Sequence, residues 1–352
     1  MRTTPLESLS HGAAAMVAMG GVSVPAHFGD PLAEARVARA GAALCDRSHR
    51  GRILARGEDR VSFLQGQTTN DVNALKPGDG CLALVLTGKG KLRGDVRVAC
   101  FPEHLLLDLE GAVAGAVKQH LERFIIMEDV VLEDVSEATA ALLVTGPTAR
   151  LLVESVLGRA VPPLSEAGWV EIQGLALMGD PAAGMEGLMI LGEPRPVDDL
   201  ARVLLERGAG RMGELGFEAL RIEAGLPRWG HEMDEDTLPG EVGLEHALSY
   251  TKGCYTGQET MARIKNFGHV NRRLVGLSLC GDELPAPGAT LEADGKVVGR
   301  VTSATVAPML DWPVALGIVR RESGEPGTRL DVVQGSQRLS AQVATLPFWR
   351  RE

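Results

Sequence analysis

The C-terminal part of the chain has a strand pattern that differs from everything before it. After Arg273, short apolar stretches recur, each bounded by glycine, proline or other turn-forming residues. These stretches cover 274–279, 297–306, 314–319 and 339–344. Short strands separated by frequent turns are typical of a small closed β-barrel. The sequence therefore predicts a barrel at the C-terminal end of the chain.

A β-hairpin is predicted earlier in the sequence. Residues 82–86 form a continuous apolar run, and the Gly-Lys-Gly-Lys segment at 88–91 reads as a turn. Apolar and charged residues then alternate over 92–98, with Asp95 among the charged ones. Because successive residues of a strand face opposite sides, this hairpin should have one polar face that carries Asp95.

The chain is too long for one hydrophobic core. It has 352 residues, and single cores stop growing at roughly 250–300 residues. Helix and strand patterns are mixed before the barrel, without strict alternation, and the mixture recurs over 169–225. We therefore predict an α+β fold with two mixed α+β units, 1–150 and 151–268, followed by the β-barrel at 269–352.

Composition argues against several classes of protein. The formal net charge is −10, which leaves no broad cationic surface for direct nucleic-acid binding. No apolar run is long enough to cross a membrane. The five cysteines include no C-x-x-C pair, which fits a reducing cytoplasm. His231 and His246 lack metal-ligand spacing, so no metal site is predicted. We expect a cytoplasmic monomer.

The most distinctive segment is K-G-C-Y-T-G-Q-E at 252–259. Two glycines beside a thiol and an aromatic ring allow the backbone to approach a ligand closely. Lys252 next to Cys254 would favour the reactive thiolate by its charge. In the alternative interpretation, this is a glycine-rich loop whose Cys254 and Tyr255 only fill a gap. The residue types alone favour the second interpretation.

This segment resembles the K-G-C-Y-x-G-Q-E signature of the YgfZ family of folate-binding proteins, a branch of the glycine-cleavage T-protein superfamily. Further stretches resemble T-protein blocks, and the likeness runs from about 11 to 347. These stretches are D-R-S-H-R-G at 46–51, the F-L and N-D residues within 63–71, R-I-E-A-G at 221–225 and G-H-E-M-D-E at 230–235. The resemblance implies a cloverleaf-like molecule around a central folate-binding channel.

Two functions follow from the resemblance. The YgfZ signature implies a tetrahydrofolate-binding accessory protein for synthesis or repair of iron–sulfur clusters, which indirectly supports tRNA-modifying enzymes. Its partners would be folate and iron–sulfur scaffold or carrier proteins. The alternative is a folate-dependent aminomethyltransferase, or another one-carbon transferase, as the T-protein blocks imply. Whether the chain turns over a reaction stays open. The T-protein branch has an acid where this chain has Gly94, which argues against efficient aminomethyl transfer.

The resemblance also implies two sets of site residues. Those assigned to chemistry are Cys254, Lys252 and Asp95. Those assigned to the cofactor are Glu223, Arg221, Trp229, Tyr255, Gln258 and Arg263. Glu223 is expected to accept hydrogen bonds from the pterin edge. The alternative for Glu223 is a structural ion pair with Arg221.

The other site residues also have alternatives. Asp95 would act near a folate nitrogen, or else belong to a solvated strand face with ordinary arginine partners. Trp229 would stack on a flat ring or fill the core. Arg263 belongs to a basic cluster with Lys265, Arg272 and Arg273, which would meet the glutamate tail of folate or form a solvated hinge. Cys254 alone cannot hold an iron–sulfur cluster, so a partner would supply the other thiolates.

Overall fold

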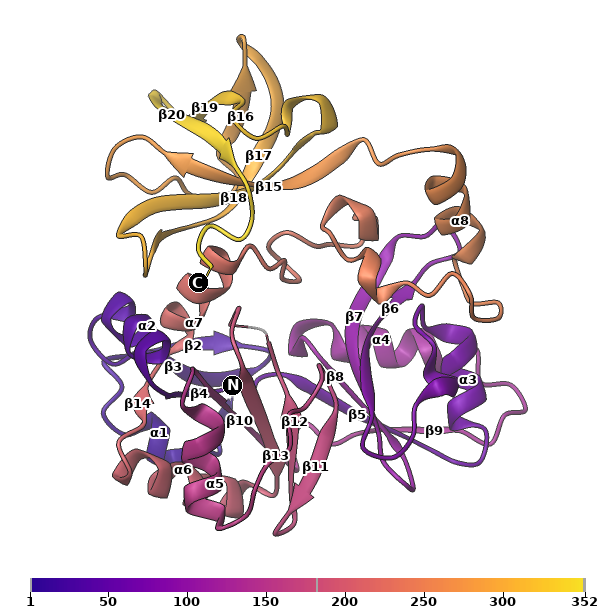
Figure 1. Ribbon diagram of the computed structural model, residues 1–352. Coiled ribbons are helices and arrows are strands. Elements are labelled where there is room, and N and C mark those ends of the chain that lie inside the picture. Colours follow the sequence, from indigo (N-terminus) through magenta and orange to yellow (C-terminus); the bar gives the residue numbers. More distant parts are fainter. Residues whose placement is uncertain (1, 182, 351–352) are drawn as a thin grey trace.

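The computed structural model describes residues 2–181 and 183–350 (Figure 1). A six-stranded sheet lies at the centre of one half of the molecule. In spatial order it contains β11 (Trp169–Ile172), β12 (Leu175–Gly179), β13 (Gly187–Gly192), β10 (Ala140–Thr145), β4 (Ala43–Asp46) and β14 (Gly210–Arg211). β10 is buried on both faces: Leu142 and Val144 face one core, and Ala141 and Leu143 face the other. Strands covered on both sides are continuous apolar runs, as this one is.

Helices cover both faces of this sheet. They are α1 (Glu7–Ser10), α5 (Ala149–Leu157) and α6 (Pro194–Glu206) on one side, and α2 (Pro31–Ala40) and α7 (Glu214–Ala224) on the other. The start of α2 follows from its sequence, because the Asp30 carboxylate accepts a hydrogen bond from the Leu32 N–H and Pro31 needs no partner there. A small sheet of β1 (Arg2–Thr3), β3 (Val22–His27) and β2 (Ala15–Met19) completes this half.

The second sheet contains the predicted hairpin. Its spatial order is β6 (Gly80–Leu86), β7 (Leu92–Cys100), β8 (Leu105–Leu109), β5 (Gly51–Arg56) and β9 (Val131–Asp134). One face packs against α3 (Arg60–Gln67) and α4 (Gly111–Glu122), and η1 (Val72–Ala74) follows α3. The other face of the hairpin carries Leu84 opposite Asp95, and Leu84 packs against Met233 and Tyr255. The predicted polar face is therefore largely covered by later parts of the chain.

The C-terminal barrel is confirmed. Its six strands close in the order β15 (Arg272–Leu279), β18 (Trp312–Arg320), β17 (Lys296–Ala307), β16 (Thr290–Ala293), β19 (Arg329–Gln334) and β20 (Gln337–Ala344). The short helix η4 (Arg321–Ser323) follows β18. Ile222 of α7 packs against Val314 and Leu316, so the outside of the barrel rests on the six-stranded half. Figure 1 shows the barrel, in orange and yellow, across the top of the two sheets.

A long crossing segment links α7 to the barrel. It contains η2 (Pro239–Glu241), η3 (Glu245–Ala247) and α8 (Gln258–Phe267), and it passes over the β6–β7 hairpin (Figure 1). None of the helices in the described ranges is both long and apolar enough to serve as a membrane span.

The α+β fold with a closed C-terminal barrel is confirmed. The strands before and after residue 150, however, do not form two separate sheets. The six-stranded sheet takes β4 and β10 from before that position and β11, β12 and β13 from after it. The reason is the antiparallel pairing of β10 with both β4 and β13, which joins distant parts of the chain. The domain boundaries at 150 and 268 stay predictions.

Candidate functional site

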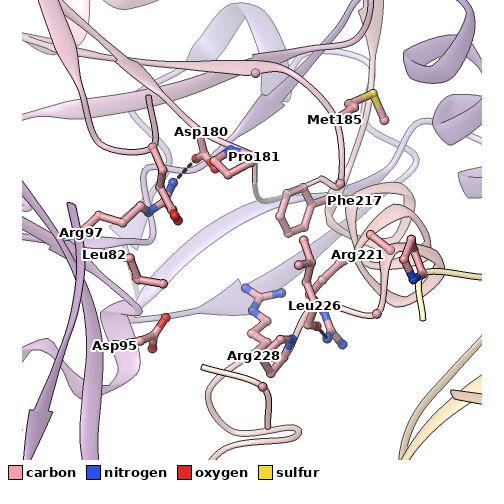
Figure 2. Close-up of a pocket in the computed structure, with 18 of the residues that line it drawn as sticks. Leu82, Asp95, Arg97, Asp180, Pro181, Met185, Phe217, Arg221, Leu226 and Arg228 are labelled. Atoms are coloured by element: carbon pink, nitrogen blue, oxygen red, sulfur yellow. Dashed lines mark hydrogen bonds and ion pairs between the residues drawn. The ribbon is translucent and has the colours of Figure 1, made fainter. Parts of the chain in front are cut away.

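A cavity of about 1200 Å³ lies where the two sheets, α7 and the barrel meet. Leu82, Asp95 and Arg97 of the hairpin form one wall (Figure 2). Figure 2 shows Phe217 and Arg228 on the opposite side. The lining thus combines apolar and aromatic side chains with charged groups of both signs, which is the usual composition of a site for an organic ligand with polar ends.

Asp95 is an acid in the cavity lining that forms no ion pair with any described residue. It is partly exposed to the cavity, yet its Oδ1 atom is buried and accepts no hydrogen bond from any described residue. Burial raises the pKa of Asp95, and the nearby Arg50 opposes this rise. The alternative of ordinary arginine partners does not hold here, because Arg93 pairs with Glu235, and Arg97 pairs with Asp108 and Asp180.

Arg97 ties the hairpin to the six-stranded sheet. Its Nε lies 3.1 Å from Asp108 Oδ2, and its Nη1 lies 2.5 Å from Asp180, which follows β12 (Figure 2). Burial alone would lower the pKa of Arg97. The two carboxylates outweigh this effect and raise the pKa above its usual range. Residues more than 80 positions apart in the sequence thus build this wall, which is why sequence reasoning missed the role of Arg97 and Asp180.

Arg221, assigned to the cofactor from the sequence, does line the cavity. Its guanidinium is fully used within the protein, however. It donates hydrogen bonds to Glu218, Glu232, the Leu226 carbonyl and Ser303. The neighbouring carboxylates raise the pKa of Arg221, so it is a permanent buried cation. Its main effect is to hold α7 against the crossing segment and the barrel.

A second buried cation, Arg228, lies next to Arg221 in the cavity wall. It pairs with Glu214 and Glu218 of α7 and with Glu110, which directly precedes α4. These acids raise the pKa of Arg228, whereas the cations around Glu110 lower the pKa of that carboxyl. No local sequence pattern predicted this network, because tertiary packing brings Glu110 and Arg228 to the two acids of α7.

Glu223 lies outside the cavity lining, contrary to the expected pterin contact. Arg39 donates hydrogen bonds to its Oε2 from Nε at 3.1 Å and from Nη2 at 2.7 Å. The Met309 N–H donates to Oε1 at 2.7 Å. Glu223 is fully buried and both its oxygens accept hydrogen bonds, which favours the structural alternative, with Arg39 in place of Arg221. Trp229, by contrast, does line the cavity.

The signature segment lies apart from the cavity lining. Lys252 is buried, and its Nζ donates hydrogen bonds to the carbonyls of Gln65, Thr68 and Asn70 at 2.6–2.7 Å. Burial lowers the pKa of Lys252 to about 8, so it stays mostly protonated at neutral pH. All three of its donors are therefore used to hold the α3–β6 connection. The expected activation of Cys254 by Lys252 has no support from this arrangement.

The other members of the signature segment have different surroundings. Cys254 is exposed, whereas Tyr255 is buried in the cluster beneath the hairpin. Gln258 begins α8 and donates to the Gly253 carbonyl at 3.5 Å, and Arg263 is exposed on the same helix. The predicted site residues thus form two groups. Asp95, Arg221 and Trp229 meet at the cavity, and the signature residues meet beside the hairpin turn.

The rest of the basic cluster also lies away from the cavity lining. Arg272 pairs with Glu241, Arg273 pairs with Glu325, and Lys265 lies 3.5 Å from the ring centroid of Tyr250. Gly94 faces α4, where a Cβ atom would come within 2.9 Å of Val117 Cγ2. A second acid therefore does not fit at this position unless the Val117 side chain shifts.

The barrel, the two sheets and the charged cavity where they meet define an α+β protein with a central cavity. Residues 6–252 match the family model described as the GCVT N-terminal domain, and residues 272–349 match the glycine cleavage T-protein C-terminal barrel domain. The chain belongs to the glycine-cleavage T-protein family. The superfamily resemblance is thereby confirmed, while the YgfZ branch stays a prediction.

The chain is similar to its relatives over nearly its full length. It is 31% identical to an aminomethyltransferase of Geobacillus kaustophilus, with 100% of this chain and 99% of the relative covered. It is 29% identical to an aminomethyltransferase of Nostoc sp., with 96% and 92% covered. Among solved structures, the glycine cleavage system aminomethyltransferase T from Bartonella henselae matches with a TM-score of 0.91 and 25% identity, with 99% and 98% covered.

Proposed function

We propose that this protein binds tetrahydrofolate, or a one-carbon derivative of it, in the central cavity. The observation that carries the proposal is the position of Asp95, a partly exposed carboxylate in the lining of a ligand-sized cavity that forms no ion pair with any described residue. Leu82, Phe217 and Trp229 add apolar and aromatic surface on which a flat heteroaromatic ring can pack. This set of groups fits a folate, which has a flat ring with hydrogen-bond donors.

The reaction class that follows is one-carbon transfer, of which aminomethyl transfer is the case supported by the relatives. Tetrahydrofolate, when bound, supplies the nitrogen that accepts the one-carbon unit. Asp95 can stabilise positive charge at such a nitrogen, and burial raises its pKa, which favours holding a proton there. Arg97 would position the wall on which Asp95 stands.

Asp95→Asn tests this proposal. We expect the wild-type protein to bind tetrahydrofolate in calorimetry, and the variant to lose about 10²-fold or more in any one-carbon transfer rate. Glu235→Gln is the control, because Glu235 is an exposed acid that pairs with Arg93. Absence of tetrahydrofolate binding by the folded wild-type protein would overturn the proposal.

A second candidate function is the accessory role in iron–sulfur cluster synthesis or repair. The observation that favours it is the exposure of Cys254 within the signature segment, at a place separate from the cavity lining. A lone thiolate can join a cluster only with ligands from a partner, such as a scaffold or carrier protein. All five cysteines are free, which supports the proposed cytoplasmic location.

Gene removal and complementation test the accessory role. The activity of cluster-containing dehydratases and the level of tRNA thiomethylation should fall when the gene is removed. Both should recover with the wild-type chain, but not with Cys254→Ser or with a T-protein. Cys280→Ser is the matched control, since Cys280 is the other exposed thiol. In parallel, glycine cleavage with a lipoylated carrier is measured. If the protein supports glycine cleavage at the rate of a T-protein and Cys254→Ser rescues fully, the accessory role is contradicted and the transferase function remains.

A further inference from the structure

The lining of the central cavity contains a second carboxylate, Glu166, that the proposed function leaves unused. Glu166 is half-buried and lies in the connection between α5 and β11. Its side chain forms no hydrogen bond or ion pair with any residue in the ranges 2–181 and 183–350. Burial raises the pKa of Glu166, because the charged form loses part of its hydration there. A ligand can therefore satisfy this carboxylate where the protein does not.

The position of Glu166 is fixed by close backbone approach to both sheets. A Cβ atom at Gly80 of β6 would lie 2.0 Å from the Ala167 carbonyl oxygen, and one at Gly179 of β12 would lie 2.2 Å from the Ser165 carbonyl oxygen. Glycine at these two positions leaves room for the segment that carries Glu166. The Ala167 N–H also donates to the Gly179 carbonyl at 3.0 Å. Glu166 is thus held firmly at the junction of the two sheets.

The charged and titratable groups that face Glu166 do not supply its missing partner. They are Arg97, Asp180, His246 and Asp95, all of which line the cavity. Arg97 already pairs with Asp108 and Asp180 (Figure 2). Asp95 has the same sign of charge as Glu166 and forms no ion pair itself. This part of the wall therefore carries carboxylates that Arg97 does not neutralise, and it favours a cationic ligand group.

This part of the lining also reaches the surface of the molecule. Glu166 lies beside the start of β6, and the short helix η3, which carries His246, packs against the same strand through Ala247 and Leu84. His246 is exposed, and Glu166 is partly exposed. A second molecule can therefore approach the cavity at this edge while another ligand occupies the space beside Phe217.

We propose that Glu166 is a specificity residue that binds the protonated amine of the second reactant, the donor or acceptor of the one-carbon unit. The inference rests on the proposed function, in which the folate ring packs in the same cavity. Transfer to or from tetrahydrofolate requires a second molecule, and an aminomethyl group carries an amine that is cationic at neutral pH. A carboxylate gives such an amine a charge-assisted hydrogen bond, which a methyl or hydroxymethyl group cannot form. Glu166 would thus select aminomethyl chemistry among one-carbon transfers.

The test titrates n-butylammonium chloride into the full-length protein saturated with tetrahydrofolate, at about pH 8. Leu82 and Leu164 line the cavity, so the NMR signals of their labelled methyl groups report binding near Glu166. We expect n-butylammonium to shift these signals. Glu166→Gln should weaken its binding about tenfold or more, the size of one lost hydrogen bond between charged groups. 1-Butanol, which has the same chain without the charge, should bind the two proteins equally.

Two further variants separate charge from structure. Glu171→Gln is the matched control, because Glu171 is an exposed acid of β11 outside the cavity lining and has no ion pair within the described ranges. It should leave the affinity for n-butylammonium unchanged. Glu166→Asp keeps the charge and should keep a preference for the amine over the alcohol. Thermal unfolding should show an intact fold for Glu166→Gln, because this side chain has no partner in the protein.

The possible failures can be told apart. Calorimetry should give the same tetrahydrofolate affinity for Glu166→Gln and for the wild-type protein, and a large loss would assign Glu166 to the folate instead. If n-butylammonium binds both proteins equally, or does not bind the wild-type protein, the inference is overturned and the folate function stands. If the wild-type protein does not bind tetrahydrofolate, the proposed function fails, and the inference fails with it.

Discussion

Arg39 and Glu223 form a buried ion pair that joins α2 to the end of α7. The Arg39 guanidinium also lies 4.9 Å from the ring centroid of Trp349, and the Glu223 backbone carbonyl accepts a hydrogen bond from the Phe348 N–H. The pair therefore connects two helices of the six-stranded half with the segment that follows the barrel. From this position we expect Glu223 to stabilise the fold and not to bind the cofactor.

Glu223→Gln should destabilise the protein by about 3–5 kcal/mol, because the variant leaves the buried Arg39 without its counter-ion. Chemical denaturation measures the effect. Glu206→Gln is the control, since Glu206 forms an exposed pair with Arg202 and should change stability by less than about 1 kcal/mol. An unchanged stability combined with lost tetrahydrofolate affinity would return Glu223 to a ligand-binding role.

Asp95→Asn should stabilise the folded protein at neutral pH by about 1 kcal/mol or more, because burial penalises the charged form of the wild-type carboxyl and asparagine carries no charge. Burial raises the pKa of Asp95, so the folded state binds its proton more tightly than the unfolded state does. Wild-type stability should therefore fall, relative to the variant, as pH rises from the ordinary aspartate pKa to the raised one. Parallel stability curves for the two proteins across that range would contradict this assignment.

The five cysteines should react with an alkylating reagent in an order set by exposure. Cys254 and Cys280 are exposed and should be modified first. Burial raises the pKa of Cys81 to about 12 and raises that of Cys45 further, so both should react slowly. Peptide mass spectrometry of the folded protein gives the order. Modification of Cys45 before Cys254 would show that the buried strand β4 opens readily.

Lys252→Met should destabilise the protein by about 3 kcal/mol, because three backbone carbonyls lose a charged donor and methionine cannot replace it. Urea denaturation measures the loss. Lys89→Met is the control, as Lys89 is exposed in the hairpin turn. If Lys252 acted mainly on the thiol instead, the variant would keep its stability and Cys254 would react more slowly.

The sequence by itself determined the local structure. The Asp30-Pro31 start of α2, the β6–β7 hairpin and the barrel strands all follow from capping, alternation and turn residues. The T-protein resemblance could also be recognised from the sequence alone, because it depends on short stretches of consecutive residues. Strand alternation also placed Asp95 on the polar face of the hairpin, and in the fold Asp95 lines the cavity, while its role toward a ligand stays a prediction.

Only the tertiary structure decided the partners of the charged groups. Sequence suggested Arg221 as the partner of Glu223 and Lys252 as the partner of Cys254, since both pairs are close along the chain. In the fold, Glu223 meets Arg39, and Lys252 meets the carbonyls of Gln65, Thr68 and Asn70. Buried charges require counter-ions or hydrogen bonds from whichever residues the packing brings near. The partners that meet this requirement come from distant parts of the sequence, so no local pattern could predict these pairs.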